Sequence, residues 1–312
     1  MTFRKLLLQL ISQVTIKVTT YIKNKGSFLS MTTYAVTAAT GHFGQTALKT
    51  LAGLVPATNI IALARNTKKA EALVPAGVTV RPGDYDNEAE LTASLAGVDK
   101  LLFVSSQPGG PVDREQQHKN VVNAAKAAGV SYIAYTSFPH ADTATSPLSA
   151  DHKATEKAIL DAGIPHSFLR NNWYLENELD SLKGAQAGRP FVYAGGDGQV
   201  GWALEREYAE GAATVLASDN QKDIYEFSGA PLTYKQLAAA LPGNFDVQAV
   251  STEDFNKGLQ AAGLDEGTAA VVTMIQQLIL DGELAKTSTD LSEILGHDLV
   301  PLDAALAEVL KA

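Results

Sequence analysis

The chain has 312 residues, of which 46% are hydrophobic and 19% charged, and its formal net charge is −9. This composition supports a sizeable core, and the length suits one large α/β domain or a core domain with an attached lobe. The negative charge argues against nucleic acid as the main partner. Because cysteine is absent, disulfides, thiolate metal sites and a cysteine nucleophile are excluded.

The first thirty residues differ in charge from the rest, because they contain no acidic residue. Their basic residues are Arg4, Lys5, Lys17, Lys23 and Lys25. The apolar run 6–11 is interrupted by Gln9, so it is too short to span a membrane, and no cleavage site typical of a secretory signal follows it. We expect Met31 to be the natural start and residues 1–30 to lie outside the fold. A weak amphipathic surface anchor is the alternative.

From Thr33 onward, short apolar runs alternate with helical patterns. The expected strands are 34–37, 60–64, 79–81, 101–104, 132–136 and 167–170. The expected helices between them are 45–54, 68–73, 88–95, 114–128 and 153–161. Parallel strands need crossover connections, so this alternation indicates a parallel sheet with helices on both faces. The pattern predicts a doubly wound, Rossmann-like nucleotide-binding fold over residues 31–169.

After Arg170 the rhythm changes. Turn-rich segments at 184–190 and 195–198 are followed by an apolar run at 224–227 and by helical patterns at 233–241, 252–262 and 267–281. We expect residues 170–312 to form a smaller α+β lobe on the substrate side, which also returns a strand or two to the main sheet. Ligands of such folds bind in the crevice at the carboxyl ends of the strands.

The segment 34–44 reads as a buried strand, a tight turn of small residues and the start of a helix. Small residues recur at intervals of three, at Ala38, Gly41 and Gly44. This spacing lets a pyrophosphate approach the backbone N–H groups of the helix N-terminus. Ala38 stands where a glycine is usual, which is tolerable if its φ is negative. The residues predicted to bind the cofactor here are Thr37, Ala38, Thr40, Gly41, His42, Phe43 and Gly44. An ordinary strand–helix turn is the alternative.

Arg65 ends the second expected strand. An NAD-selective site has a carboxylate at this position, which would repel a 2′-phosphate, whereas an arginine can pair with that phosphate. Lys68 and Lys69 follow within a turn and add positive charge. The charge pattern therefore predicts NADP(H) as cofactor. A surface arginine at a strand end is the alternative.

Further cofactor contacts are expected at the ends of the next strands. Asp84, beside Tyr85, can accept from the adenine amino group, or it can cap the following helix. Ser105, Ser106 and Gln107 follow the fourth strand, below the expected nicotinamide ribose, or they form a helix-entry turn. Ser137 and Phe138, after the fifth strand, complete the predicted cofactor set.

Many short-chain dehydrogenases use a Tyr-x-x-x-Lys pair, in which the lysine lowers the tyrosine pKa for proton transfer. Residues 31–312 contain no such pair. The one match, Tyr21 with Lys25, lies in the basic leader, which is the segment of residues 1–30. Lys153 stands where the lysine is expected, but Ser149 occupies the tyrosine position. Alcohol–ketone chemistry is therefore disfavoured, and a quinone, whose delocalised oxyanion needs little acid, fits better.

The densest polar and aromatic run, 171–177, follows the sixth expected strand. Trp173 and Tyr174 could stack on a planar acceptor, and Asn172 could orient it. Aromatic packing into the second lobe is the alternative. His140 could donate to a carbonyl oxygen, or it could simply face solvent. No metal site is predicted, because the histidines form no ligand-spaced pair with carboxylates.

These residues carry a family resemblance. The chain resembles the NmrA-like branch of the atypical short-chain dehydrogenases, and within it most closely the bacterial NAD(P)H:quinone oxidoreductases of type 2. The resemblance rests on the opening turn and on 64–66, 83–85, 120–130, 134–137, 140–142 and 169–177. It implies NADPH in the cleft between two lobes and a quinone near the nicotinamide. Ala38 and the basic leader depart from the family pattern.

The leading hypothesis is a cytoplasmic, NADPH-dependent oxidoreductase that transfers hydride to a quinone or similar small electrophile. Its candidate catalytic residues are His140, Lys153, Asn172 and Tyr174. A homodimer is left open, and no membrane span is expected. A redox sensor of the NmrA type, which binds NAD(P) without turnover, is the first alternative. An ether or double-bond reductase with Lys153 as general acid is the second.

Overall fold

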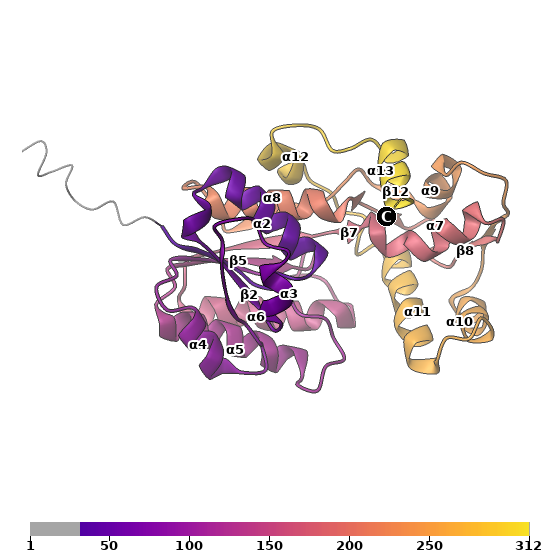
Figure 1. The fold of residues 1–312 in the computed structure, drawn as a ribbon. Helices are drawn as coiled ribbons and strands as arrows, with labels where there is room; N and C mark the ends of the chain where they lie inside the picture. Colours follow the sequence, from indigo (N-terminus) through magenta and orange to yellow (C-terminus); the bar gives the residue numbers. More distant parts are fainter. Residues whose placement is uncertain (1–31, 312) are drawn as a thin grey trace, which may run out of the picture. The chain divides into compact units, whose positions relative to one another are not determined.

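The computed structural model describes residues 32–311, and the description below concerns the compact unit that begins at Thr33. The prediction for residues 1–30 lies outside the described residues. The described residues build a seven-stranded parallel sheet with strand order β11-β6-β5-β4-β1-β2-β3 (Figure 1). Its strands are β1 Tyr34–Val36, β2 Ile60–Ala64, β3 Thr79–Pro82, β4 Lys100–Phe103, β5 Tyr132–Ser137, β6 His166–Asn171 and β11 Ile224–Phe227.

The prediction of a doubly wound parallel sheet is confirmed. β1 lies between β2 and β4, because Tyr34 is in register with both Ile60 and Lys100. From β1 the chain winds outward first to β3 and then, from β4, in the opposite direction to β11. The strand order therefore reverses between β1 and β4, and a crevice outside the carboxyl ends of these strands is the expected ligand position.

Helices cover both faces of the sheet (Figure 1). One face carries α2 His42–Leu54, α8 Glu205–Ala217 and α12 Asp290–Leu295, and the other carries α4 Glu88–Ser94, α5 Arg114–Ala128 and α6 Pro147–Ala162. Successive β1 side chains contribute to opposite faces: Val36 belongs to the first core cluster and Ala35 to the second. This alternation is the two-residue period of a strand, and burial on both sides explains why the strands are continuously apolar.

Most of the chain after Arg170 builds a second lobe around its own apolar core. Its helices are α7 Leu179–Gln186, α9 Tyr234–Ala240, α10 Thr252–Ala261, α11 Glu266–Leu280 and α13 Leu302–Val309, with the 3-10 turn η2 Leu175–Glu178. Its strands pair two by two, as β7 Trp173–Tyr174 with β10 Trp202–Ala203, β8 Phe191–Tyr193 with β13 Val247–Ala249, and β9 Gln199–Val200 with β12 Leu232–Thr233. The segment expected to be turn-rich from 184 is helical through Gln186.

The second part of the chain also completes the main sheet. β11 pairs with β6 in parallel, while α8 and α12 belong to the core on one face. β11 thus adds a strand from the second part of the chain to the main sheet. The division into 31–169 and 170–312 stays a prediction. Within the described part of the chain, every helix is too short or too polar to span a bilayer.

Candidate functional site

Two buried hydroxyl groups, those of Thr37 and Tyr85, hold the turn after β1 in place through hydrogen bonds. Thr37 Oγ1 accepts a 2.9 Å bond from the Val104 N–H, which ties the turn to the chain after β4. The Tyr85 hydroxyl lies 2.5 Å from Thr37 Oγ1 and 2.7 Å from the Val104 carbonyl oxygen. The structure therefore places Thr37 and Tyr85 beneath the turn, where they fix its shape.

Ala38 adopts a φ of +52°, so the condition under which an alanine is tolerable at this position, a negative φ, is not met. The reversal after β1 brings the Ala39 N–H to the Leu63 carbonyl at 3.1 Å and the Gly41 N–H to the Ala38 carbonyl at 3.0 Å. These two bonds hold Ala38 in the left-handed region, where a Cβ crowds the following carbonyl. The alanine therefore occupies a position for which glycine is better suited.

The Ala38→Gly variant is expected to be more stable than wild type by about 0.5–1 kcal/mol, because relief of strain exceeds the added entropy of the unfolded chain. Urea denaturation followed by circular dichroism measures the difference. Ala39→Gly is the matched control, since Ala39 is a neighbouring buried alanine without positive φ, and that variant should lose stability. Equal effects of the two substitutions would contradict strain at Ala38.

The α2 N-terminus begins directly beyond this turn, and its own N-cap residue supplies no side-chain hydrogen bond. Its N-cap residue is Gly41, and its first turn has no acidic residue. By contrast, Asn66, Asn87 and Asp113 each cap their own helix through a side-chain oxygen. A 13-residue helix that starts at the carboxyl edge of β1 with a glycine N-cap directs its first N–H groups and its dipole toward an anion.

Glu205, at the start of α8, is a residue at this N-terminus that sequence reasoning missed. Burial raises the pKa of Glu205, while the charge of His42 and the Phe43 N–H act in the opposite direction. Glu205 therefore places a carboxyl group beside this helix end, where the Phe43 N–H favours its charged form and burial opposes it. The residue had no local signal, because α8 lies far along the chain from α2.

Arg65 follows the last residue of β2 and is exposed. Within residues 32–311, its guanidinium forms no ion pair. The next residue, Asn66, caps the short helix α3 Thr67–Glu71, accepting from the Lys69 N–H at 3.0 Å. An arginine without a carboxylate partner at the carboxyl edge can pair with a phosphate.

Asp84 lies in the loop after β3 and is half-buried. Its Oδ1 accepts from the Asp86 N–H at 3.2 Å. The α4 cap is Asn87, which accepts from the Glu90 N–H at 3.1 Å, so the alternative that Asp84 caps this helix is wrong. Contact of Asp84 with adenine stays a prediction.

The chain after β4 is held in place by a buried histidine. The Ser106 N–H donates to His118 Nε2 at 3.0 Å, and His118 Nδ1 lies 2.7 Å from Thr155 Oγ1. Burial and, to a lesser extent, Arg114 lower the pKa of His118 to about 3, so the ring is neutral. Because Nε2 accepts, the proton sits on Nδ1 and donates to Thr155.

Arg114 fixes the same loop from the other side, donating from Nε to the Ser106 carbonyl at 2.7 Å. The Ser105 N–H donates to Thr136 Oγ1 at 2.8 Å, whereas Gln107 is exposed. Sequence reasoning missed His118 and Arg114. The available signal was the run of polar residues on the buried side of α5, where Gln117, His118 and Asn120 all lie.

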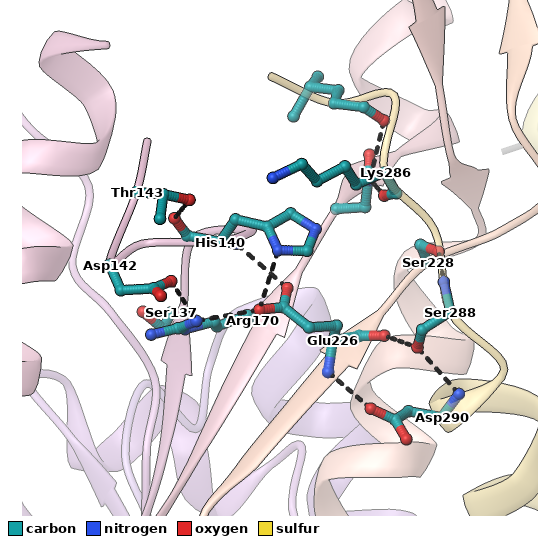
Figure 2. Close-up of polar contacts among 12 residues, drawn as sticks. Ser137, His140, Asp142, Thr143, Arg170, Glu226, Ser228, Lys286, Ser288 and Asp290 are labelled. Atoms are coloured by element: carbon teal, nitrogen blue, oxygen red, sulfur yellow. Dashed lines mark hydrogen bonds and ion pairs between the residues drawn. The ribbon is translucent and has the colours of Figure 1, made fainter. Parts of the chain in front are cut away.

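An arginine surrounded by carboxylates lies at the carboxyl ends of β5, β6 and β11 (Figure 2). Arg170 binds Glu156 through two bonds, Nε to Oε1 at 3.0 Å and Nη2 to Oε2 at 2.8 Å. Its Nη1 donates to Glu226 Oε1 at 3.0 Å and to Asp142 Oδ1 at 2.7 Å. Ser137 donates to Glu156 Oε1 at 2.6 Å. We call these five residues the Arg170 cluster.

Glu226 links this cluster to His140. The His140 N–H donates to Glu226 Oε2 at 3.1 Å, and its ring Nδ1 lies 3.4 Å from Glu226 Oε1. His140 has a φ of +46°, which is uncommon for a residue other than glycine. Figure 2 shows the other ring nitrogen pointing away from Glu226. His140 and Lys286 line the same cavity of about 210 Å³, so His140 is half-buried rather than simply solvent-facing.

The remaining predicted catalytic residues are not brought together at one point. Lys153 Nζ donates to the Ala144 carbonyl at 2.5 Å, which tethers the loop after β5. Asn172 donates from Nδ2 to the carbonyls of Leu284 and Lys286 at 3.1 and 3.3 Å, so its amide joins β6 to the 284–286 segment. Their catalytic roles stay predictions.

Tyr174 and Trp173 face opposite ways, as neighbours in a strand do. The Tyr174 ring stacks on Phe43 of the glycine turn with centroids 6.3 Å apart, and its hydroxyl accepts from Asn171 Nδ2 at 3.0 Å. Trp173 points into the second lobe, where its Nε1 donates to Glu178 at 3.2 Å. Tyr174 therefore borders the expected cofactor crevice, whereas Trp173 lies on the opposite side of β7.

Phe138 is buried and packs against His152. Among residues 32–311, no group of three or more histidine, aspartate or glutamate side chains could hold a metal ion.

Comparison with known proteins agrees with this geometry. Residues 38–200 match the model of a family described as NAD(P)H-binding. Quinone oxidoreductase 2 of Escherichia coli is 41% identical over 281 residues, covering 88% of this chain and 98% of that protein. An NmrA-like family domain-containing oxidoreductase of Aspergillus flavus is 25% identical, covering 89% of this chain and 94% of that protein.

Solved structures give the same result. The E. coli NADPH-dependent quinone oxidoreductase complexed with NADPH superposes with a TM-score of 0.84 at 41% identity, covering 88% of this chain and 99% of that chain. The triphenylmethane reductase of Citrobacter sp. complexed with NADP(H) gives 0.81 at 37% identity, covering 89% and 100%. The chain belongs to the NAD(P)H-binding, NmrA-like family of oxidoreductases.

Proposed function

We propose that the protein is an NADPH-dependent oxidoreductase that transfers hydride to a quinone or a similar small electrophile. The observation that carries the proposal is the pair formed by the α2 N-terminus and Arg65, which forms no ion pair within residues 32–311, at the carboxyl edges of neighbouring strands β1 and β2. The α2 N-terminus binds the pyrophosphate, and Arg65 binds the 2′-phosphate. The similarity to the E. coli quinone oxidoreductase indicates the acceptor class.

The residues present fit this cofactor. The turn 38–44 would hold the pyrophosphate against backbone N–H groups, Arg65 would hold the 2′-phosphate, and Ser105–Gln107 would border the nicotinamide ribose. When bound, NADPH supplies the hydride. The protein's part is to place the acceptor against the nicotinamide and to exclude competing reactions, which makes proximity and orientation the main source of acceleration.

A proton must also reach the reduced acceptor, and His140 is the side chain best placed to give it. Glu226 holds one ring nitrogen, while the other points away from that carboxylate, and the residue lines the cavity that it shares with Lys286. A hydroquinone oxyanion is delocalised and can also be protonated by water. His140→Ala should therefore lower the rate without abolishing it. The homodimer and the cytoplasmic location stay predictions.

The direct test mixes purified protein with NADPH and a panel of benzoquinones and naphthoquinones. We expect nicotinamide absorbance to fall faster than in the uncatalysed reaction for at least one acceptor. Saturable NADPH binding without turnover of any acceptor would contradict the proposed oxidoreductase activity and favour the alternative of a redox sensor.

The Arg65→Glu variant should reverse the cofactor preference. A carboxylate repels the 2′-phosphate and accepts from a ribose 2′-hydroxyl, so we expect the ratio of kcat/KM for NADPH over NADH to fall by at least about tenfold. Steady-state kinetics with both cofactors measures it. Lys126→Glu is the control, because it makes the same charge change on an exposed residue at the far end of α5. An unchanged ratio in Arg65→Glu would exclude the phosphate contact.

A further inference from the structure

The second lobe contains a cavity of about 300 Å³ between α7, β8, α9, α10 and α11, elements that Figure 1 shows grouped in that lobe. Its lining is mainly aromatic and aliphatic and includes Trp173, Phe191, Tyr234, Phe255 and Ile275. Glu178, at the end of η2, also lines it. None of the lining residues belongs to the set predicted to bind the cofactor, and Trp173 contacts Glu178 here whereas Tyr174 stacks on Phe43, so the cavity is separate from the crevice that Tyr174 borders.

Glu178 is held in a nest of neutral donors. Trp173 Nε1, Trp202 Nε1 and the Tyr234 hydroxyl all donate to Oε1, at 3.2, 3.3 and 3.1 Å. Gln276 supports the nest, because its Nε2 donates to the Tyr234 hydroxyl at 2.8 Å. All three contacts reach the same oxygen, so Oε2 is left to the cavity. The residue as a whole is 7% exposed.

Within the described part of the chain, the Glu178 carboxyl group has no countercharge. Among the described residues that line the cavity, none is basic, and within residues 32–311 Glu178 forms no ion pair. A buried carboxylate without a cation is costly, even when hydrogen bonds satisfy one oxygen. Burial raises the pKa of Glu178 to about 7, against the stabilising bonds from Tyr234, Trp202 and Trp173. The group therefore changes charge near neutrality.

We propose that this cavity binds a small organic cation, with an apolar body about the size of one aromatic ring and a single protonated amine. The ammonium pairs with Glu178 Oε2, and the rings of Trp173 and Tyr234 offer their faces to it. An organic anion would be repelled by the carboxylate, and a neutral apolar molecule would leave the charge unpaired. The cavity volume sets the size limit.

Tryptophan fluorescence reads this site directly, because the chain has two tryptophans and both donate to Glu178. The probes at pH 8 are benzylamine, benzyl alcohol and benzoate. We expect a saturable emission change with benzylamine, at least tenfold weaker binding of benzyl alcohol, and no saturable change with benzoate. Benzoate binding, equal binding of the amine and the alcohol, or no saturable change with benzylamine would overturn the proposal.

The Glu178→Gln variant keeps an acceptor for the three donors and turns an amide NH₂ toward the cavity. It should bind benzylamine at least tenfold more weakly and benzyl alcohol about as well as wild type does. Glu266→Gln is the matched control, because it removes the same charge from an exposed position on α11, and it should bind like wild type. Val272→Phe keeps Glu178 but fills the cavity, and it should lose benzylamine binding. Unchanged benzylamine affinity in either cavity variant would overturn the proposal.

A pH titration separates the charge of Glu178 from the shape of the cavity. Tyr234 is the one titratable group among the partners of Glu178 in the described chain, and burial raises its pKa well above the ordinary value, so it stays neutral. Wild-type emission should titrate near pH 7, and benzylamine affinity should fall as pH drops through that value. Glu178→Gln should show neither change. A pH-independent affinity in wild type would contradict pairing with the carboxylate.

Stability provides a readout without ligand. Below about pH 4.5, Glu178 is protonated in both the folded and the unfolded chain. Between pH 4.5 and 7 the unfolded chain ionises first, so wild-type stability falls as pH rises and levels off above pH 7. Glu178→Gln should therefore unfold at higher urea than wild type at pH 8, by a margin that shrinks toward pH 5. The opposite order at pH 8 would mean that an internal cation already pairs with Glu178.

Discussion

The Arg170→Met variant should be less stable than wild type by about 3–5 kcal/mol, because it leaves buried carboxylates without their cation. The Arg170 side chain is 5% exposed and that of Glu156 8% exposed, and the two form a bidentate pair. Methionine fills most of the volume of the Arg170 side chain but carries no charge to neutralise the carboxylates. Urea denaturation at pH 7.5, followed by circular dichroism, measures the loss.

Two comparisons isolate the buried charge. Arg206→Met removes an arginine that is 35% exposed and pairs with Glu308 at the surface, which should cost less than about 1 kcal/mol. The double variant Arg170→Met, Glu156→Met removes both members of the buried pair and should regain part of the loss. If Arg170→Met costs no more than Arg206→Met, the cluster does not hold the strand ends together.

The same variant should also affect the chemistry, since the Arg170 cluster holds Glu226 and Glu226 grips His140. With Arg170 gone, the His140 ring loses its orientation, so kcat for quinone reduction should fall more than the affinity for NADPH. That contrast separates a positioning role at the acceptor side from general loss of structure.

The central sheet could be predicted because its strands are buried on both faces. Such strands read as continuous apolar runs bounded by glycine or proline, and the bounds of β2, β11 and α5 were predicted as the structure has them. The parallel direction of the strands follows from their alternation with helices. These elements are specified locally, so local patterns suffice.

Several helices escaped prediction for physical reasons. α8 packs against α2 on one side and α12 on another, so its apolar residues do not form one clean stripe at helical spacing. α6 begins at Pro147, six residues before the predicted start, although proline at the first helical position is a known start signal. Elements buried on several sides lose the periodicity that reveals a surface helix.

The candidate site also has a part that the local sequence predicted and a part that it did not. The spacing of Ala38, Gly41 and Gly44 indicated which positions must be small, but it carried no information on the backbone angle that Ala38 adopts. The Arg170 cluster and the Glu178 nest assemble side chains from strands and helices far apart in sequence. No short pattern marks such partners, because the fold alone brings them together.

The Gly44→Ala variant is expected to lose about 2–4 kcal/mol of stability, because α2 crosses the turn too closely to admit a side chain. A Cβ at Gly44 would lie 2.3 Å from the Ala38 carbonyl oxygen, 2.9 Å from its carbonyl carbon and 3.1 Å from the Ala39 Cα. All three are backbone atoms, so no flexible side chain can yield. α2 must move away from β1, which pulls its N–H groups from the pyrophosphate position, and NADPH should bind at least about tenfold more weakly.

Gly53→Ala is the matched control, because it makes the same substitution near the other end of the same helix. A Cβ at Gly53 meets nothing within 4 Å, so alanine should raise stability by about 0.5–1 kcal/mol through helix propensity alone. NADPH affinity should not change, since Gly53 lies three turns from the N-terminus of α2. Urea denaturation and fluorescence titration with NADPH measure both effects. Gly44→Ala could instead unfold at the same urea concentration as Gly53→Ala and bind NADPH as wild type does. In that case α2 does not pack closely against the turn, and the proposed pyrophosphate position at its N-terminus loses its structural basis.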